Sequence, residues 1–521
     1  MQLKRFIILF ILIVLGHYSF AANSLQVAQN ILDRLYSIHG NSLSRKPRIE
    51  LIDKKSNVAI YSKSKNVIQL ERSAYKLCAN FGKDSLDALA FILAHELIHA
   101  VQSAPNSLKT SFISFDASPL SSVEFERNAD VQGLFICYLA GFNSINILPE
   151  LIDRMYEKYG LSNKSIRGYP TRIERKNSSQ LAINQVNKLI ELFGLSNRLS
   201  QMSFFQQSIQ CLEYILKYYQ GREIFNNLGI NYALHGMNLT VLQGETYVYP
   251  LELDWNLRIK KPKNSRGNEP ISPLLFLEQQ KLFLKAREYF LATDKQDPQY
   301  AATNINLFAI EILLDNLETA QTFYLKNLRN TKSLGQDDVN SQRIQMLYAI
   351  LTAKLNQNEE AIKIWTNLSL SRDPTISYQS QYNLKVINKS RNLALQSSQN
   401  NFDHTMFNWA NIADANLKLN SIDAEEWISL DSTNSILRKE LPNSIFYSFQ
   451  KKEFPVIHFQ EIKLTDKLQF KARSNYINYL GNNQKIIFSI EDHAAFILNE
   501  NDLVRTLVRF QDFRYLDPDE N

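Results

Sequence analysis

Residues 94–99 read Ala94-His95-Glu96-Leu97-Ile98-His99 and lie inside a strongly apolar run. On an α-helix, residues four apart lie one above the other on the same face, so His95 and His99 can present two imidazole nitrogens to one ion. Glu96 follows about 100° round the helix and can reach a water on that ion without ligating it. The pattern suits zinc hydrolysis. In the alternative interpretation, both are core histidines whose nitrogens bond backbone carbonyls.

The residues that precede the two histidines predict a central helix. Asp84-Ser85-Leu86-Asp87 has the pattern of a capping box, and Leu86, Ala90, Leu93 and Leu97 then recur at helical spacing. Further apolar residues cover most of the remaining circumference, so we expect the helix to be buried. Burial favours a catalytic metal, because dry and fixed surroundings strengthen the electrostatic forces on its bound water.

A second predicted helix, beginning at residues 124–130 and stopped near Gly141, offers a third metal ligand. Glu126 and Asp130 are four residues apart and share a face. Glu126 would complete a His-His-Glu set, while Asp130 would accept a hydrogen bond from a ligand histidine and fix its tautomer. The alternative is a solvated acidic face, which the apolar residues from Ala129 onward disfavour.

These motifs together resemble the M48 metallopeptidases. The similarity lies in His95-Glu96-x-x-His99, in Glu126-x-x-Ala129-Asp130-x-x-Gly133 and in residues 140–143, and it extends in organisation over roughly residues 25 to 195. Within the family, the chain is most similar to soluble periplasmic members that carry tetratricopeptide repeats, such as the β-barrel assembly-enhancing proteases. The resemblance implies a gluzincin-type domain with one zinc ion (Zn2+) per chain and with Glu96 as general base.

One departure from the family pattern lies in Tyr169-Pro170-Thr171-Arg172-Ile173-Glu174-Arg175, which is similar to the family's His-Pro…Arg segment. Tyr169 stands at the histidine position, from which the family's side chain can approach the zinc or the scissile carbonyl. A tyrosine hydroxyl could donate to an oxyanion or occupy the open metal position in a resting state. The resemblance gives Arg175 the role of orienting carboxylates or polarising the intermediate; the alternative is a surface ion pair.

The N-terminus has the pattern of a secretory signal peptide over residues 1–21. Lys4 and Arg5 precede the apolar run 6–16, and a small-x-small end favours cleavage after Ala21. The run is short for a membrane span, so an uncleaved anchor is the weaker alternative. No cysteine follows it, which argues against a lipoprotein. We therefore expect a periplasmic or secreted protein without a transmembrane span after cleavage.

Charge and cysteine content exclude few functions. The 58 basic and 52 acidic residues nearly balance, giving a formal charge of +6, and nothing demands nucleic acid. Three cysteines in an exported chain leave at least one thiol free. A Cys78–Cys137 disulfide is possible, but buried thiols are the favoured interpretation.

Within the predicted protease domain, residues 22–195, we expect a helix at 24–38 and strands at 49–52, 58–61 and 67–70. The strand at 58–61 could pair with an extended substrate through main-chain hydrogen bonds. Residues 103–123 are rich in serine and proline and form either a lid over the site or an ordinary surface loop.

From residue 200 to 390 the pattern predicts tetratricopeptide-like helix pairs. Ala286 and Phe290 recur 34 residues later as Ala320 and Tyr324, and residues 361–365 give a further copy. Such repeats stack into a solenoid whose concave surface binds a protein partner. A generic helical bundle is the alternative. Residues 391–521 predict a small α+β domain of unreadable role.

The fold class expected for the whole chain is therefore α+β, mainly helical, with the protease domain followed by the α-solenoid and the C-terminal domain. The expected function is a zinc endopeptidase of the bacterial envelope, which degrades or matures misassembled envelope proteins recruited through the repeats. The resemblance suggests the outer-membrane assembly machinery as partner. The alternative function is an envelope chaperone or scaffold with a latent or inactive protease domain, which Tyr169 keeps open. A soluble aminopeptidase is weaker, because no site for a free amino terminus is visible.

Overall fold

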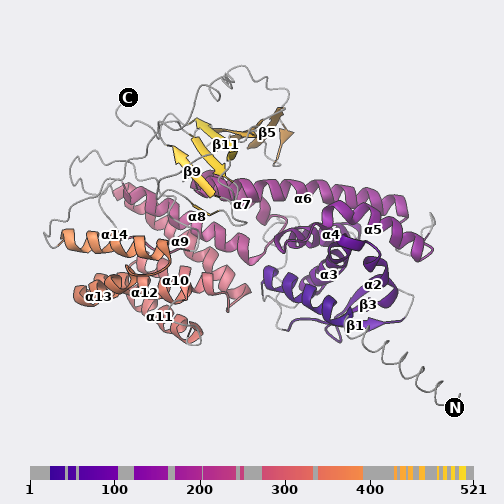
Figure 1. Ribbon diagram of the computed structural model, residues 1–521, viewed down its shortest axis with the longest axis horizontal. Helices are drawn as coiled ribbons and strands as arrows, with labels where there is room; N and C mark the ends of the chain where they lie inside the picture. The colour runs from indigo at the N-terminus through magenta and orange to yellow at the C-terminus, as the bar shows by residue number, and fades with distance from the viewer. Residues whose placement is uncertain are drawn as a thin grey trace, which may run out of the picture. The chain divides into compact units, whose positions relative to one another are not determined.

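The computed structural model is mainly helical with small sheets, in agreement with the predicted class (Figure 1). It describes residues 24–40, 45–53, 58–103, 122–161, 170–201, 204–241, 247–251, 273–331 and 338–390, and the strands between residues 428 and 511. The predicted signal peptide, Tyr169 and nearly all of the predicted loop 103–123 lie outside the described residues.

The chain divides into two compact units. The first contains Met1–Gly194, Leu212–Asn227 and Tyr289–Tyr300, and the second contains Leu195–Cys211, Leu228–Glu288 and Ala301–Asn521. The four domain limits drawn from the sequence remain predictions, since the two units divide the chain by contacts and interleave along it.

A three-stranded sheet lies in the first unit, in the order β1-β3-β2. Its strands are β1 (Arg48–Ile52), β2 (Ala59–Ser62) and β3 (Val67–Glu71), which agree with the predicted positions to within a residue or so. β3 runs parallel to β1 and antiparallel to β2. The central strand carries the buried Ile68 and Leu70, while β2 forms an edge.

The central helix of this unit is α3 (Ser85–Gln102). It contacts β2, β3, α2 (Arg72–Ala79), α4 (Ser122–Leu139) and α5 (Ser144–Lys158). Its residues from Ala88 to Leu93 are all buried, as the apolar circumference predicted. A predicted helix near the N-terminus is also present, at residues 24–39, and α6 (Arg172–Gln201) begins in this unit.

The predicted capping box at the start of α3 is wrong. Asp84 precedes the helix, but its side chain makes no capping hydrogen bond, because its backbone (φ −93°, ψ 10°) belongs to the preceding 3₁₀ turn and not to the extended region that a cap requires. The Asp87 carboxylate instead accepts a hydrogen bond of 2.9 Å from the backbone N–H of Asn143. It therefore ties α3 to the start of α5.

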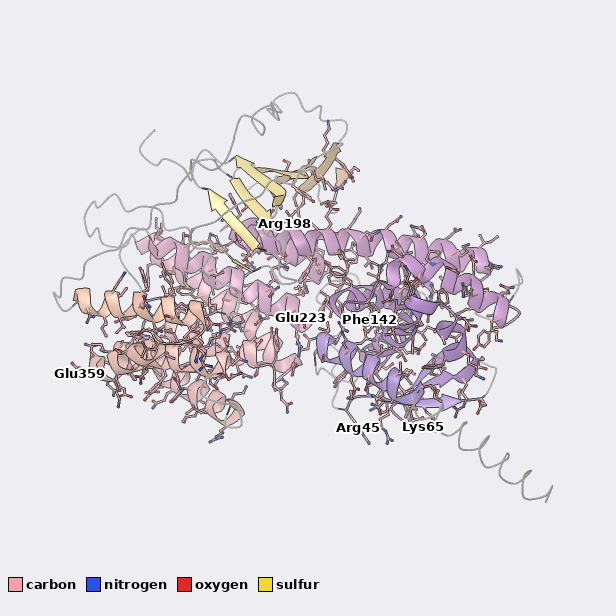
Figure 2. The ribbon with its side chains drawn as sticks, viewed as in Figure 1. Arg45, Lys65, Phe142, Arg198, Glu223 and Glu359 are labelled. Carbon is pink, nitrogen blue, oxygen red and sulfur yellow. The ribbon has the colours of Figure 1, made fainter. Side chains whose placement is uncertain are left out.

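The predicted stop of α4 at Gly141 is present and has two causes. Gly141 has φ +78°, and the N–H of Phe142 donates 2.8 Å to the carbonyl of Cys137, closing the helix end. A Cβ on Gly141 would lie 2.8 Å from the guanidinium of Arg34. That guanidinium lies over the ring of Phe142, 5.0 Å from the ring centre. Phe142 is labelled in Figure 2.

Five helices of the second unit pack as consecutive pairs. They are α10 (Ala301–Leu313), α11 (Leu317–Thr331), α12 (Val339–Lys354), α13 (Asn358–Leu368) and α14 (Pro374–Ser390). Each contacts the next, and α12 also contacts α10 and α14, which is the arrangement of stacked helix pairs. Ala320 and Ala361 are fully buried, as expected for repeats. Their assignment as tetratricopeptide repeats remains a prediction.

Three helices connect these parts along the chain: α7 (Phe205–Leu216), α8 (Arg222–Val241) and α9 (Pro273–Gln296). The unit limits fall inside all three of them. Ala286 on α9 therefore belongs to the second unit and Phe290, four residues later, to the first, although both are fully buried as the repeat pattern expects.

The end of the chain forms an antiparallel sheet in the order β4-β5-β6-β7-β11-β10-β9-β8. In chain order its strands are β4 (Ile428–Ser429), β5 (Ile436–Leu441), β6 (Ser444–Phe449), β7 (Ile457–Lys463), β8 (Asn478–Tyr479), β9 (Lys485–Ser489), β10 (Ala494–Leu498) and β11 (Val504–Gln511). Three of them, β7, β9 and β10, lie where the sequence has strand-like patterns, and β11 lies where the sequence pattern of residues 503–510 left helix or strand open. The helical part of the predicted α+β domain has no counterpart among the described residues.

Two further observations concern membranes and thiols. Within the described ranges, no helix combines the length and the apolar character that a bilayer span needs. Cys78, Cys137 and Cys211 are all free and buried, so the possible Cys78–Cys137 disulfide is not formed. Burial raises the pKa of the Cys78 and Cys137 thiols to about 12, which makes them inert in the folded protein.

Candidate metal centre

The two histidines of α3 point at a common position, as their spacing predicted. The Nε2 atoms of His95 and His99 lie 3.0 Å apart, and the two rings are nearly perpendicular. Both residues are half-buried on the face of α3 that α4 covers. Ring nitrogens that close must share either a proton or a cation.

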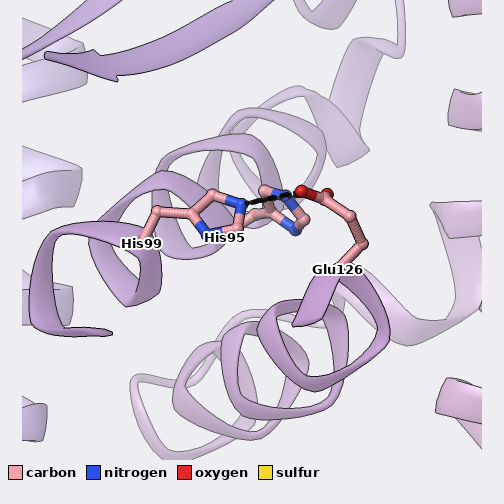
Figure 3. A group of neighbouring side chains, drawn as sticks. All are labelled: His95, His99 and Glu126. Carbon is pink, nitrogen blue, oxygen red and sulfur yellow. Dashed lines mark hydrogen bonds and ion pairs between the residues drawn. The ribbon is translucent and has the colours of Figure 1, made fainter. Parts of the chain in front are cut away.

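Glu126 reaches the same position from the first turns of α4 (Figure 3). Its Oε2 lies 3.2 Å from His95 Nε2 and its Oε1 lies 3.5 Å from His99 Nε2. One ligand atom from each of the three residues lies within 4.8 Å of the others. About half of the Glu126 side chain is exposed, so the cluster opens to solvent on its Glu126 side.

A glycine sets how closely the two helices approach. An added Cβ at Gly133 of α4 would lie 3.2 Å from the backbone nitrogen of His95 and 3.4 Å from its Cα. One turn before it, Ala129 and Asp130 are fully buried against α3. Small residues on α4 let the two helices pack closely, ridge into groove. This close packing brings Glu126 within reach of the two imidazoles.

Asp130 lies behind His95, as predicted. Its Oδ1 is 2.9 Å from His95 Nδ1, so the carboxylate accepts a hydrogen bond from that nitrogen and leaves the Nε2 lone pair for the shared position. The Asp130 carboxylate also accepts two hydrogen bonds from Arg175 of α6, one of 2.7 Å between Nη2 and Oδ1 and one between Nη1 and Oδ2.

Arg175 is therefore a positioning residue in this geometry. Its side chain is 17 % exposed and its carboxylate partner is not exposed at all, so the pair is a buried one and the alternative of a surface ion pair is wrong. Arg175 orients a carboxylate, which is the first of the two roles that the resemblance gave it. Tyr169 lies outside the described residues.

The local charges suit a cation. Burial acts to lower the pKa of His95, but its hydrogen bonds to Asp130 and Glu126 outweigh burial and raise that pKa to about 10. Burial acts to raise the pKa of Glu126, but hydrogen bonds to the two imidazoles hold it well below its usual range. Likewise the Arg175 charge overcomes burial and lowers the pKa of Asp130 to about 2.

The donor set therefore fits a zinc ion. Two imidazole nitrogens and one carboxylate oxygen are the protein ligands of many catalytic zinc sites, which leave a further position open. The orienting carboxylate behind His95 is the usual outer partner of such a ligand. Because these ligand atoms bind a cation only when they carry no proton, a divalent cation would compete with protons for them.

Glu96 makes a contact that the sequence did not predict. Its Oε2 accepts a 2.7 Å hydrogen bond from the backbone N–H of Tyr61 on the edge strand β2. The N–H of Glu71 donates to the C=O of Val58, so these two residues form a hydrogen-bonded pair. Such pairs alternate with non-hydrogen-bonded pairs along antiparallel strands, and in this register Tyr61 falls in a non-hydrogen-bonded pair. The N–H and C=O of Tyr61 therefore point away from β3. The carboxylate of Glu96 thus caps the open edge of β2.

Two other neighbours were missed. Gln102 Oε1 lies 3.1 Å from His99 Nδ1, and the ring of Phe125 stacks on the His99 ring with centres 5.2 Å apart. Gln102 follows His99 by three residues, so helical spacing could have identified it. Phe125 could not be found that way, because its contact depends on how α4 meets α3.

Comparison with known proteins does not identify a family for this chain. No protein-family model matches the sequence, and no curated protein matches it either.

Proposed function

We propose that the chain is a zinc-dependent endopeptidase of the M48 type. One observation carries the proposal: two helices bring a pair of imidazoles and one carboxylate to a common position, with their ligand atoms within 4.8 Å of one another. The buried Asp130 behind His95 supports it further, because a structural histidine pair needs no such orienting carboxylate.

His95, His99 and Glu126 would hold the zinc, and the bound ion would supply Lewis-acid activation of a water and of the peptide carbonyl. Glu96, next to His95 on α3, would accept the proton of the attacking water and deliver it to the leaving amine. Asp130 and Arg175 would hold His95 in one orientation. Tyr169 remains the proposed donor to the oxyanion, on the strength of the resemblance alone.

An extended substrate would pair with the edge of β2. The outward N–H and C=O of Tyr61 are the groups that an added antiparallel strand needs, and they lie next to Glu96. Because the Glu96 carboxylate accepts a hydrogen bond from the Tyr61 N–H, a substrate strand would compete with Glu96 for that N–H. Proline at positions 58–62, one at a time, should impair cleavage most at 61; a scan that leaves cleavage unchanged would count against this binding mode.

The decisive experiment measures metal and cleavage together. Purified protein should carry one zinc per chain by elemental analysis and should cleave casein in a reaction that a chelator stops. Glu96→Gln should keep the zinc and lose cleavage by several orders of magnitude, whereas Glu157→Gln on the exposed side of α5 should change neither. Retained cleavage in Glu96→Gln refutes the general-base role, and protein without metal refutes the peptidase.

The cellular setting follows from sequence features. The signal-like N-terminus favours the periplasm or secretion, and the stacked helix pairs of the second unit favour recruitment of a misassembled envelope protein or of the outer-membrane assembly machinery. Tyr169 at the family's histidine position favours a second candidate, an envelope chaperone or scaffold with a latent protease domain. A stoichiometric zinc content with chelator-sensitive cleavage would exclude that candidate.

A further inference from the structure

A short non-helical segment of the second unit lies buried against the stacked helices. Residues 247–251 read Tyr-Val-Tyr-Pro-Leu and form neither helix nor sheet. Val248, Tyr249 and Leu251 are nevertheless 7 %, 5 % and 2 % exposed. A chain segment without secondary structure must find partners elsewhere for its backbone groups when it is buried this deeply.

Asn383 of α14 supplies those partners. Its Oδ1 accepts a 2.7 Å hydrogen bond from the N–H of Val248, and its Nδ2 donates 3.1 Å to the C=O of the same residue. This side-chain amide therefore binds both main-chain groups of Val248, as a neighbouring β-strand would. Asn383 is itself fully buried, and its amide also contacts Met346 Sδ of α12 at 3.6 Å.

The side chains of the segment lie among residues of α10 to α14. The ring of Tyr247 packs on Trp365 of α13 with centres 5.2 Å apart. Burial, and with it the negative charge of Asp315 between α10 and α11, raises the pKa of Tyr249. The segment is thus held by main-chain hydrogen bonds from Val248 to α14 and by aromatic packing of Tyr247 on α13.

The same helices carry two further buried polar groups. Gln379 precedes Asn383 by one turn of α14 and is 1 % exposed, yet its Oε1 has no hydrogen-bond partner among the described residues. Four residues of helix rise about 6 Å, which is close to the spacing of alternate residues in an extended chain. The buried Nε1 of Trp365 likewise lacks an acceptor within the described part of the chain. Such groups are costly unless a ligand or water meets them.

We propose that helices α12 to α14 form a groove for an extended peptide, and that residues 247–251 occupy it as an internal ligand. The partner is a polypeptide segment in which aromatic and aliphatic residues alternate before a proline. It binds by taking the place of residues 247–251, with Asn383 holding its main chain and the Trp365 ring packing on its aromatic residue. The proposal does not depend on the zinc site.

The internal segment lowers the apparent affinity of the groove for that partner. A tethered ligand acts at an effective concentration on the order of millimolar. If the groove binds a free peptide at about 10 μM, the internal copy weakens the apparent affinity about 100-fold, because only the fraction of chains with an open groove can bind. The unmodified protein should therefore bind weakly, and loss of the internal contact should strengthen binding.

The first experiment uses the unmodified full-length chain and a peptide with the sequence of residues 245–253. Hydrogen exchange should be at least about tenfold faster at the Val248 amide than at Leu347 in the core of α12, because the segment opens locally. The peptide should accelerate exchange at Val248 and leave Leu347 unchanged. Equal exchange rates at the two amides, or no effect of the peptide, would show that the segment is an integral part of the core and would overturn the proposal.

The second experiment tests the groove itself by fluorescence anisotropy of the labelled peptide. Replacing residues 247–251 by Gly-Ser-Gly-Ser-Gly should tighten peptide binding about 10- to 100-fold. Methylating the valine nitrogen of the peptide should weaken binding to that variant about tenfold or more, since the donor to Asn383 is lost. A scrambled peptide should not bind.

A clamp variant covers the case in which the segment replacement does not fold. Asn383→Leu in the unmodified chain should accelerate exchange at Val248 and abolish peptide binding, while Asn367→Leu, on the exposed face of α13, should do neither. If Asn383→Leu leaves both measurements as they are in the unmodified protein, Asn383 does not hold the segment and the groove assignment is wrong.

Discussion

The buried pair of Asp130 and Arg175 gives the most direct test of how the candidate site is built. Asp130 has no exposed surface and Arg175 is 17 % exposed, and two hydrogen bonds join them. We consider three variants: Asp130→Asn, Arg175→Met and the double variant. Each single change leaves one buried charge without its main partner, whereas the double change leaves neither charge.

The magnitudes follow from that difference. Removing one partner of a buried ion pair costs about 3–5 kcal/mol, and the partial exposure of Arg175 favours about 3 kcal/mol for each single variant. The double variant should cost much less than the sum, because methionine fills the arginine volume and no charge remains unpaired. The expected coupling free energy is about 2–3 kcal/mol.

The assay is urea unfolding with chelator present, so that metal does not contribute. The measurement needs a probe that reports on the first unit. The buried thiols of Cys78 and Cys137 provide it, because they react with a thiol reagent only when this unit opens.

The control pair is Arg172 with Asp153, which joins α6 to α5 as Arg175 with Asp130 joins α6 to α4, but its side chains are 40 % and 29 % exposed. Its coupling free energy should stay below about 1 kcal/mol. If the Asp130–Arg175 coupling is no larger than that of the control pair, the two residues do not act as one buried unit, and the account of how His95 is positioned is refuted.

Three other outcomes are expected. Gly133→Leu should force α4 away from the backbone of His95 and lower the free energy of unfolding by about 1–3 kcal/mol or more in thiol-monitored unfolding. Unchanged stability would mean that a Cβ at this position does not come as close as 3.2 Å to the His95 backbone nitrogen. Burial, together with the charge of Arg222, lowers the pKa of His39 to about 4. As pH falls below about 6.5 the unfolded chain takes up this proton before the folded one, so the contribution of His39 to the free energy of unfolding should drop by about 2 kcal/mol from pH 7 to pH 5. His39→Gln should flatten this part of the pH profile, and an unaltered profile would place the titration elsewhere. Glu126→Gln should weaken zinc binding at least about tenfold by competition with a chelator, whereas Glu124→Gln, two residues earlier on α4, should leave it within about twofold.

Local spacing in the sequence predicted much of the first unit. The four-residue spacing of His95 and His99 places both rings on one helix face, and the same spacing places Glu126 and Asp130 together on α4. The three strands of the small sheet also followed from short-range patterns. These features depend on backbone geometry within a few residues, which is why a linear pattern carries them.

Short-range patterns failed where a distant group competes for the same atoms. The capping box at Asp84 was a reasonable local prediction, yet Asp87 bonds to Asn143 and the turn before the helix takes Asp84 out of the capping conformation. The contact of Glu96 with the Tyr61 N–H is of the same kind. Nothing in the sequence near Glu96 names β2 as its neighbour.

By itself, the sequence determined which side chains share a helix face and so which groups could act together: two imidazoles on α3, two carboxylates on α4. Only the tertiary structure decided that these faces meet, that Arg175 rather than water completes the shell of Asp130, and that residues 247–251 lie under Asn383. The physical reason is that side-chain spacing on one element is fixed by the covalent backbone, whereas contacts between elements depend on close packing of the whole unit, here on the missing Cβ of Gly133.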